Sequence, residues 1–211
     1  MNKLNKAIIN EFWHRTSLKD SNRWTSSNIL DFEYTYLAEI IGNFKSMDIL
    51  DLGCGSGDLS RRIMKKEDTL VAVDYISNYA RFYNEEDNQY FKTQDLLEFS
   101  TKKQFDLILL FGVVTHLELT EETEMYKKIK LWLRKGGLAV IKNQVSLTQE
   151  LVVNEYSTNL EFDYSARYPS LESQTKIINQ IFGNCRVLTY PEQFNTFKNT
   201  IHVSYVIEEQ S

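Results

Sequence analysis

Three of the eight glycines in the chain, Gly53, Gly55 and Gly57, lie within five residues of one another. They follow the largely apolar run 49–52 and precede a helical pattern, so the sequence predicts a strand, a glycine turn and a helix. Glycine lets a ligand approach the backbone closely, at the edge of a parallel sheet where ligands bind. The spacing is G-x-G-x-G, whereas dinucleotide-binding turns have G-x-G-x-x-G. Asp51, two residues before the first glycine, would repel a pyrophosphate and favours a cationic ligand.

Two further acids lie where later strands are expected to end. Asp74 follows the apolar run 69–73, a position from which a carboxylate accepts hydrogen bonds from ribose hydroxyls. Asp95 follows a short third strand over 89–92, where a carboxylate can accept a hydrogen bond from an adenine amino group. The three acids therefore indicate a cationic ligand that carries a ribose.

Short, nearly all-apolar runs alternate with helical patterns, and the clearest runs are 47–52, 69–73, 105–111 and 138–141. Such runs are typical of strands buried on both faces of a parallel sheet. Residues 120–135 show helical periodicity, and we expect Gly136 and Gly137 to end that helix. The alternation predicts right-handed crossovers and a doubly wound α/β fold.

The two ends of the chain depart from this alternation. Residues 6–43 are expected to be helical and to lie outside the sheet, and 171–182 to form a helix that Gly183 ends. The runs 185–190 and 201–207 are predicted strands, joined by a loop too short for a crossover helix, so we expect them to pair antiparallel. No linker or repeat divides the chain. We expect one domain over 1–211, with a helical N-terminal cap (1–45), a ligand-binding core (46–143), an acceptor cap (144–170), and a helix with antiparallel strands (171–211).

The motifs resemble, in their order, those of class I S-adenosylmethionine-dependent methyltransferases of the small-molecule type, from the turn 51–57 through the runs 105–108 and 133–138. The resemblance covers roughly 47–143, and it implies a Rossmann-like fold with a seven-stranded, mostly parallel sheet. It also implies that the cofactor is S-adenosylmethionine, with the glycine turn beside its methionine half. The residues assigned to the cofactor are Asp51, Gly53, Cys54, Gly55, Asp74 (ribose), Tyr75, Asp95 and Leu96 (adenine), and Phe111 and Gly112 (sulfonium).

Methyl transfer from a sulfonium is an in-line substitution, so the protein mainly aligns the acceptor, the methyl group and the sulfur. A base is needed only where the acceptor must lose a proton. His116, after the fourth strand, is the candidate base; the alternative is that it opens a helix and packs structurally. Asn143, at the end of the fifth strand, is either a substrate-binding residue, as in relatives that methylate amines, or a solvated strand end. His202, in an edge strand, is expected to be structural.

Two segments outside the core are expected to cover the site. In the N-terminal segment, Trp13 and His14 are candidates to bind the acceptor and Trp24 to cover the cofactor; the alternative is that the aromatic residues pack into their own helical core. The connection 145–169 is longer than usual, which predicts a cap over the acceptor site. Arg167 and Tyr168 in it are expected to bind a polar or anionic substrate.

Composition limits the class of partner and the compartment. There are 24 basic and 29 acidic residues, so the net charge of −5 argues against nucleic acid as the partner. No segment approaches the roughly 18 to 20 apolar residues of a membrane span. Two cysteines form no disulfide framework, which is typical of a reducing cytoplasm. We expect a cytoplasmic protein, a monomer or a homodimer, with no metal site.

The sequence therefore predicts an S-adenosylmethionine-dependent methyltransferase that acts on oxygen or nitrogen of a small polar metabolite. A sugar or surface-polysaccharide precursor, an amine and a phosphoramide all remain open as acceptors. Two other classes also remain: an NAD-dependent oxidoreductase, against which Asp51 and the glycine spacing argue, and a noncatalytic protein that binds S-adenosylmethionine.

Overall fold

The computed structural model describes residues 3–18, 26–42, 44–158, 161–195 and 197–209. Its main sheet has seven strands in the order β3-β2-β1-β4-β5-β9-β8. The bounds are β1 Asp48–Leu52, β2 Thr69–Asp74, β3 Gln89–Thr93, β4 Phe105–Phe111, β5 Leu133–Ser146, β8 Arg186–Thr189 and β9 Thr200–Glu208. Strands β1 to β5 pair parallel, whereas β9 pairs antiparallel with both β5 and β8. The predicted doubly wound sheet with a C-terminal antiparallel pair is confirmed.

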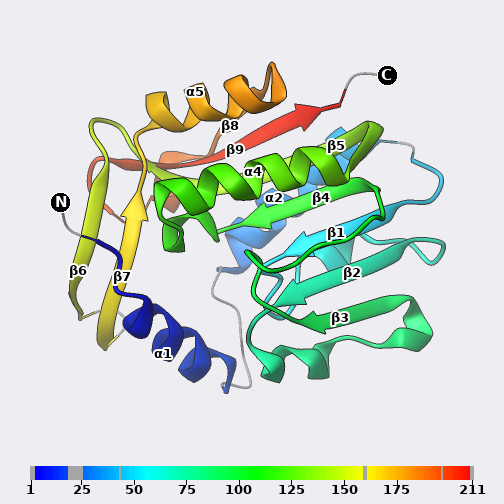
Figure 1. Ribbon diagram of the computed structural model, residues 1–211, viewed down its shortest axis with the longest axis horizontal. Coiled ribbons are helices and arrows are strands. Elements are labelled where there is room, and N and C mark those ends of the chain that lie inside the picture. The colour runs from blue at the N-terminus through cyan, green and yellow to red at the C-terminus, as the bar shows by residue number, and fades with distance from the viewer. Residues whose placement is uncertain (1–2, 19–25, 43, 159–160, 196, 210–211) are drawn as a thin grey trace.

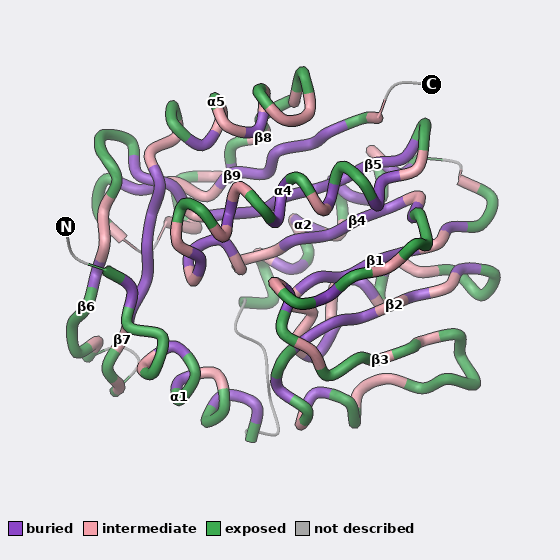
Figure 2. The backbone as a smooth tube through the Cα atoms, viewed as in Figure 1, coloured by how far each residue is buried: buried purple, intermediate pink, exposed green. Residues whose placement is uncertain are grey.

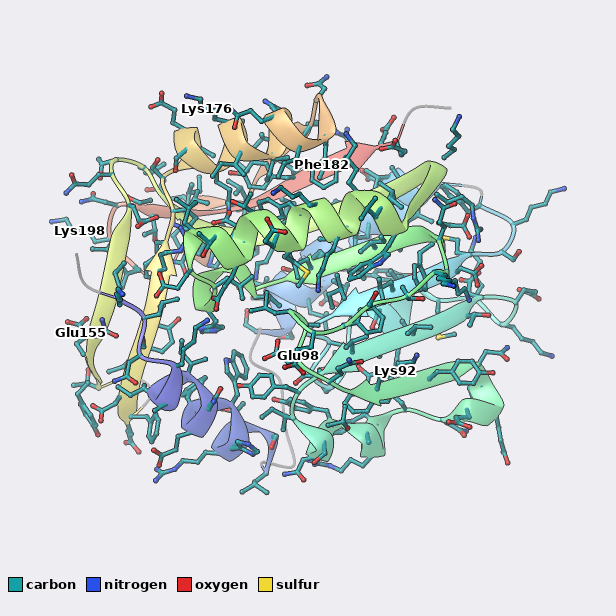
Figure 3. All side chains as sticks on the ribbon, viewed as in Figure 1. Lys92, Glu98, Glu155, Lys176, Phe182 and Lys198 are labelled. Carbon is teal, nitrogen blue, oxygen red and sulfur yellow. The ribbon has the colours of Figure 1, made fainter. Side chains whose placement is uncertain are left out.

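Helices cover both faces of this sheet (Figure 1). The helices are α1 Lys6–Ser17, α2 Ser27–Ile41, α3 Ser60–Ile63, α4 Leu119–Trp132 and α5 Leu171–Phe182. Successive strand residues point to opposite faces, so Leu50 packs in the core under α4 and α5, and Ile49 packs in the core under α2. The central strands are accordingly buried on both sides (Figure 2). Charged side chains of both signs, such as Lys92, Glu155 and Lys176, lie at the periphery (Figure 3).

A β-hairpin of β6 (Leu151–Ser157) and β7 (Phe162–Tyr168) occupies most of the expected cap, and α1 packs against it (Figure 1). The Phe12 ring lies 6.0 Å from the Tyr164 ring, and the Arg15 guanidinium lies 4.6 Å from the centre of the Phe162 ring. The N–H of Asn5 also donates to the Ser165 hydroxyl at 2.8 Å. The N-terminal helix and the hairpin therefore form one unit beside the sheet. No helix in the described part of the chain is long and apolar enough to cross a bilayer.

Two expected element ends differ from the structure. Helix α4 ends at Trp132, and Gly136 and Gly137 lie inside β5 instead of ending the helix. A Cβ at Gly137 would lie 2.8 Å from the carbonyl oxygen of Arg134 and 3.0 Å from that of Asp106, so this glycine permits close backbone approach. Strand β5 also runs on to Ser146, because it pairs with β9 over 138–146.

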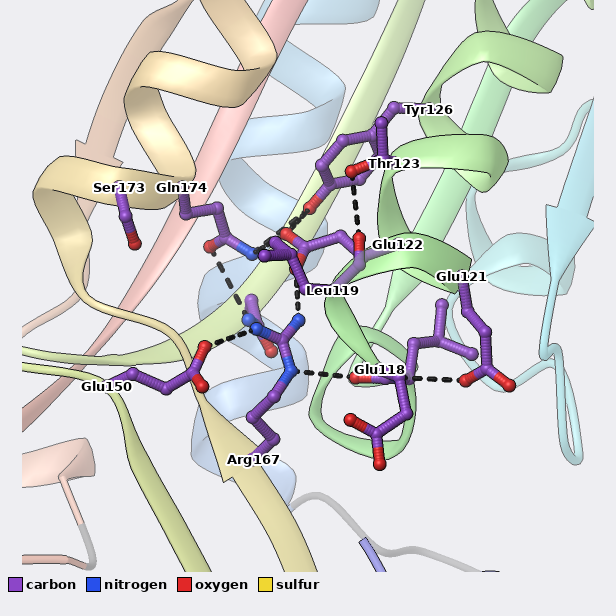
Figure 4. A network of polar contacts seen from close by, with 12 residues as sticks. Glu118, Leu119, Glu121, Glu122, Thr123, Tyr126, Glu150, Arg167, Ser173 and Gln174 are labelled. Carbon is purple, nitrogen blue, oxygen red and sulfur yellow. Dashed lines mark hydrogen bonds and ion pairs between the residues drawn. The ribbon is translucent and has the colours of Figure 1, made fainter. Parts of the chain in front are cut away.

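Arg167 on β7 was expected to bind substrate, but it ties the hairpin to α4 instead (Figure 4). Only 1% of Arg167 is exposed, and its guanidinium contacts the carboxylates of Glu122 and Glu150. Its Nε also donates to the Leu117 carbonyl at 2.7 Å. The amide of Gln174 donates to Glu122 at 2.9 Å, which brings α5 into the same network. Because these partners occupy its guanidinium, Arg167 is a structural residue and does not bind substrate.

We predict that Arg167→Met lowers the free energy of unfolding by about 3–5 kcal/mol, because Glu122 is then a buried carboxylate without its partner. Denaturant titration measures the change. The double variant Arg167→Met/Glu122→Gln removes both charges and should lose less stability. Arg186→Met, on an exposed site of β8, is the control and should stay within about 0.5 kcal/mol of the wild type. Equal stability of the Arg167 and Arg186 variants would contradict this role.

Candidate functional site

A cavity of about 390 Å³ lies at the carboxyl ends of the parallel strands. Its walls come from the segments that follow β1, β2, β3 and β4, and from β5 and β9 on the far side, with α1 and α2 beside it. The strand order reverses between β1 and β4, which is where open α/β sheets bind ligands. The fold therefore brings side chains from distant parts of the sequence to one site.

The glycine turn lines this cavity, and two of its glycines leave no room for a side chain. Gly53 and Gly57 have φ values of 70° and 66°, a region that other residues rarely adopt. A Cβ at Gly53 would lie 2.3 Å from a methyl carbon of Val113, and one at Gly57 would lie 2.4 Å from the hydroxyl of Tyr83. The turn is thus packed closely between its neighbours.

Asp74 connects this turn to the end of β2. Its carboxylate accepts the N–H of Gly55 at 3.0 Å and the N–H of Ile76 at 2.9 Å. Only 6% of Asp74 is exposed, and burial raises its pKa above the ordinary value, against the effect of these hydrogen bonds. A carboxylate has about four lone-pair sites, so it retains capacity to accept from a ligand.

Asp51 lies close enough to Asp74 for the two carboxylates to repel each other. Only 7% of Asp51 is exposed, and burial together with the charge of Asp74 raises its pKa to about 7, although a hydrogen bond with the Ser60 hydroxyl lowers it. No basic side chain in the described part of the chain contributes to the pKa of either acid. The cavity thus holds two neighbouring buried acids that have no basic partner among the described side chains.

The remaining predicted cofactor residues lie on the walls of the same cavity. Asp95 is exposed, and its Oδ1 accepts the N–H of Leu97 at 2.8 Å. Gly112 has a φ of 71°, and no atom lies within 4 Å of the position that a Cβ would take. Burial raises the pKa of the Cys54 thiol well above its usual value, so this group is protonated at neutral pH. The cavity brings together Asp51, Gly53, Cys54, Gly55, Asp74, Tyr75, Asp95, Leu96, Phe111 and Gly112. Trp24 lies outside the described residues.

His116 and Trp13 line the cavity too, with ring centres 5.5 Å apart in an edge-to-face arrangement. The Nδ1 of His116 is buried and has no hydrogen-bond partner among the described residues. Burial and the charge of Lys6 together lower the pKa of His116 to about 4, although a hydrogen bond to the Ser165 backbone opposes both. The imidazole is therefore neutral at pH 7 and has an uncommitted nitrogen.

Three further residues expected to bind the acceptor do not line the cavity. His14 is exposed on α1, because consecutive helical residues point about 100° apart and Trp13 takes the inward position. Asn143 is fully buried and donates to Gln174 of α5 at 3.4 Å. Tyr168 is buried and stacks on Phe197 at 5.6 Å.

The cavity also contains side chains for which we made no binding prediction. Lys142 and Gln144 point into it, because strand residues alternate and Asn143 between them faces α5. A strand extended to Ser146 would have indicated this alternation. Glu33 of α2 lines the cavity as well, and so does His202 of β9, a residue that we expected to be structural.

A family model described as a methyltransferase domain matches residues 49–137. Malonyl-(acyl-carrier protein) O-methyltransferases 1 and 2 of Ilyobacter polytropus are each 26% identical to the chain, over 160 and 156 residues. These matches cover 72% and 68% of the chain but only 58% and 60% of the relatives, so the chain spans about three fifths of their length.

Solved structures share the fold at lower identity. The 1,6-didemethyltoxoflavin-N1-methyltransferase of Burkholderia thailandensis, solved with 1,6-didemethyltoxoflavin and S-adenosylhomocysteine, has a TM-score of 0.75 and 15% identity, over 98% of this chain and 89% of that one. The N-methyltransferase NodS from Bradyrhizobium japonicum WM9, in complex with S-adenosylhomocysteine, has a TM-score of 0.67 and 14% identity, over 95% and 98%. Residues 49–137 thus resemble a methyltransferase domain, and the chain shares the fold of methyltransferases that were solved with S-adenosylhomocysteine.

Proposed function

We propose that the protein transfers the methyl group of S-adenosylmethionine to an oxygen or nitrogen of a small polar molecule. The observation that carries this proposal is the pair of buried acids, Asp51 and Asp74, without a basic partner in the described residues. A ligand with a positively charged group relieves their repulsion, whereas a pyrophosphate increases it. S-adenosylmethionine carries a sulfonium and an ammonium group, and its sulfonium supplies an electrophilic methyl group.

The chain's own residues hold this cofactor in the proposed arrangement. The glycine turn provides a surface without side chains, on which the methionine half fits. Asp74 accepts hydrogen bonds from the ribose hydroxyls, and Asp95 accepts one from the adenine amino group. Gly112 leaves open space next to Phe111, so that the reacting part of the ligand lies close to the backbone.

His116 is the proposed base for acceptors that must lose a proton. The acceptor oxygen or nitrogen forms a bond to the methyl carbon while the bond from carbon to sulfur breaks. The proton of the acceptor goes to the imidazole, for which the neutral ring and its unpartnered Nδ1 are suited. Trp13, in edge contact with the ring, holds its orientation.

The proposal includes both oxygen and nitrogen as the atom that receives the methyl group. The names of the curated relatives specify O-methylation, and the two solved structures described above are of N-methyltransferases. A hydroxyl of a sugar or surface-polysaccharide precursor, an amine and a phosphoramide all have a proton that His116 would accept.

We predict that cofactor affinity increases as Asp51 ionises. The pKa of Asp51 is raised from 3.8 to about 7, so the carboxyl is mainly neutral at pH 6 and mainly charged at pH 8. A cationic ligand favours the charged form, so the contribution of this group increases the affinity for S-adenosylmethionine by at most about tenfold over that range. Calorimetric titration at several pH values measures it. The matched variant Asp51→Asn removes this contribution, and identical pH profiles for the two proteins would contradict the proposal.

We predict that His116→Gln lowers kcat by about 10²–10⁴-fold and leaves the affinity for S-adenosylhomocysteine unchanged, because the ring acts on the acceptor. Wild-type activity should not depend on this group above about pH 5, since its pKa is about 4. The assay follows methyl transfer to an acceptor found by screening hydroxyl and amine compounds. His14→Gln, on the exposed side of α1, is the control. Full turnover by His116→Gln would rule out the base.

A further inference from the structure

A second group of titratable side chains lies in the cavity, where β5 meets β9. Lys142 and Gln144 lie on β5, and His202 on β9 is the ladder partner of Gln144. Directly opposed residues of an antiparallel pair point to the same face, so these three side chains lie together. Glu33 of α2 approaches Lys142 from the helix that covers this face, and all four residues line the cavity. The cofactor residues described above come from β1 to β4, so this end of the cavity is free for the acceptor.

The ion pair in this group is buried. Lys142 Nζ lies 3.4 Å from Glu33 Oε1, and the two side chains are only 11% and 4% exposed. The Tyr190 hydroxyl donates to the same oxygen at 3.1 Å. Glu33 occupies the face of α2 that also buries Leu30 and Leu37, where an apolar residue would pack without loss of hydration. The desolvation free energy of two buried charges generally exceeds the attraction that a contact of this length provides. A contribution to folding stability therefore does not explain why this ion pair is buried.

His202 adds a neutral polar group beside the pair. Its Nδ1 is buried and has no hydrogen-bond partner among the described residues. Burial, together with the charge of Lys142, lowers the pKa of His202 to about 3, so the ring is neutral at physiological pH. A buried nitrogen of this kind is costly unless a ligand or water pairs with it.

The charges of this group already balance. Lys142 and Glu33 cancel, and His202 is neutral. A carboxylate or phosphate would add negative charge to a cavity that also holds Asp51 and Asp74. A neutral ligand keeps the balance: its oxygen accepts a hydrogen bond from an ammonium N–H of Lys142, and its N–H or O–H group pairs with the imidazole of His202.

We propose that Glu33, Lys142 and His202 form the recognition site for the methyl acceptor, and that they bind a neutral group with an oxygen acceptor next to an N–H or O–H donor, such as a carboxamide, a lactam or adjacent hydroxyls. This inference rests on the proposed function, because it places the acceptor beside the cofactor residues. It names Lys142 and His202 as the residues that set acceptor specificity.

The test uses benzamide, benzoate and phenyl phosphate as probes on the full chain saturated with S-adenosylhomocysteine, with binding followed by ligand-observed NMR titration. We expect the wild type to bind benzamide more tightly than either anion. The double variant Glu33→Gln/Lys142→Met removes both charges without leaving an unpaired acid, and it should bind benzamide about tenfold more weakly. His202→Phe should weaken benzamide binding as well, and Lys66→Met, at an exposed site, should leave it unchanged.

Three results would overturn the inference: tighter binding of either anion, no binding of benzamide, or equal benzamide affinity in the wild type and the double variant. Calorimetry with S-adenosylhomocysteine on the same samples separates this inference from the proposed function. Failure of the wild type to bind S-adenosylhomocysteine contradicts the proposed function. Normal S-adenosylhomocysteine binding combined with any of the three results contradicts the acceptor site alone.

Discussion

The Asp74 carboxylate joins the glycine turn to the end of β2, because it accepts the N–H groups of Gly55 and Ile76 at 3.0 and 2.9 Å. This contact holds the turn against the sheet and brings Asp74 close to Asp51. Both acids are nearly buried, and their repulsion helps to raise the pKa of Asp51 to about 7. The same geometry that builds the turn therefore creates a site with a deficit of positive charge, which the sulfonium of the proposed cofactor would correct.

The cavity wall away from the glycine turn includes residues of the unit formed by α1 and the hairpin β6–β7. Arg167 fixes this unit to α4 and also donates to the carbonyl of Leu117, the residue next to His116. Trp13 of α1 packs against the His116 ring. The buried network in Figure 4 thus connects the position of the cap with the position of the proposed base. Residues far from the glycine turn consequently help to position the side of the cavity where the acceptor is proposed to bind.

The core of the fold and the convergence of three acids on one cavity could be predicted from the sequence for a physical reason. Parallel strands buried on both faces have continuous apolar runs, and their carboxyl ends converge, so Asp51, Asp74 and Asp95 had to meet. The side of the cavity that we propose for the acceptor depends on pairing between distant segments. The length of β5 is set by β9, and this length decides that Lys142 and not Asn143 faces the cavity. Likewise, Arg167 is a structural residue because β7 places it beside Glu122 of α4, which no local pattern indicates.

The central claim is that the turn held by Asp74 binds S-adenosylmethionine, and calorimetric titration of this cofactor and of NAD tests it most directly. The wild type should bind S-adenosylmethionine at one site and show no heat with NAD. Asp74→Asn replaces one acceptor oxygen by a donor, so it should weaken cofactor binding by about tenfold or more while thermal unfolding shows a folded protein. Binding of NAD without binding of S-adenosylmethionine, or unchanged affinity in Asp74→Asn, would contradict the account.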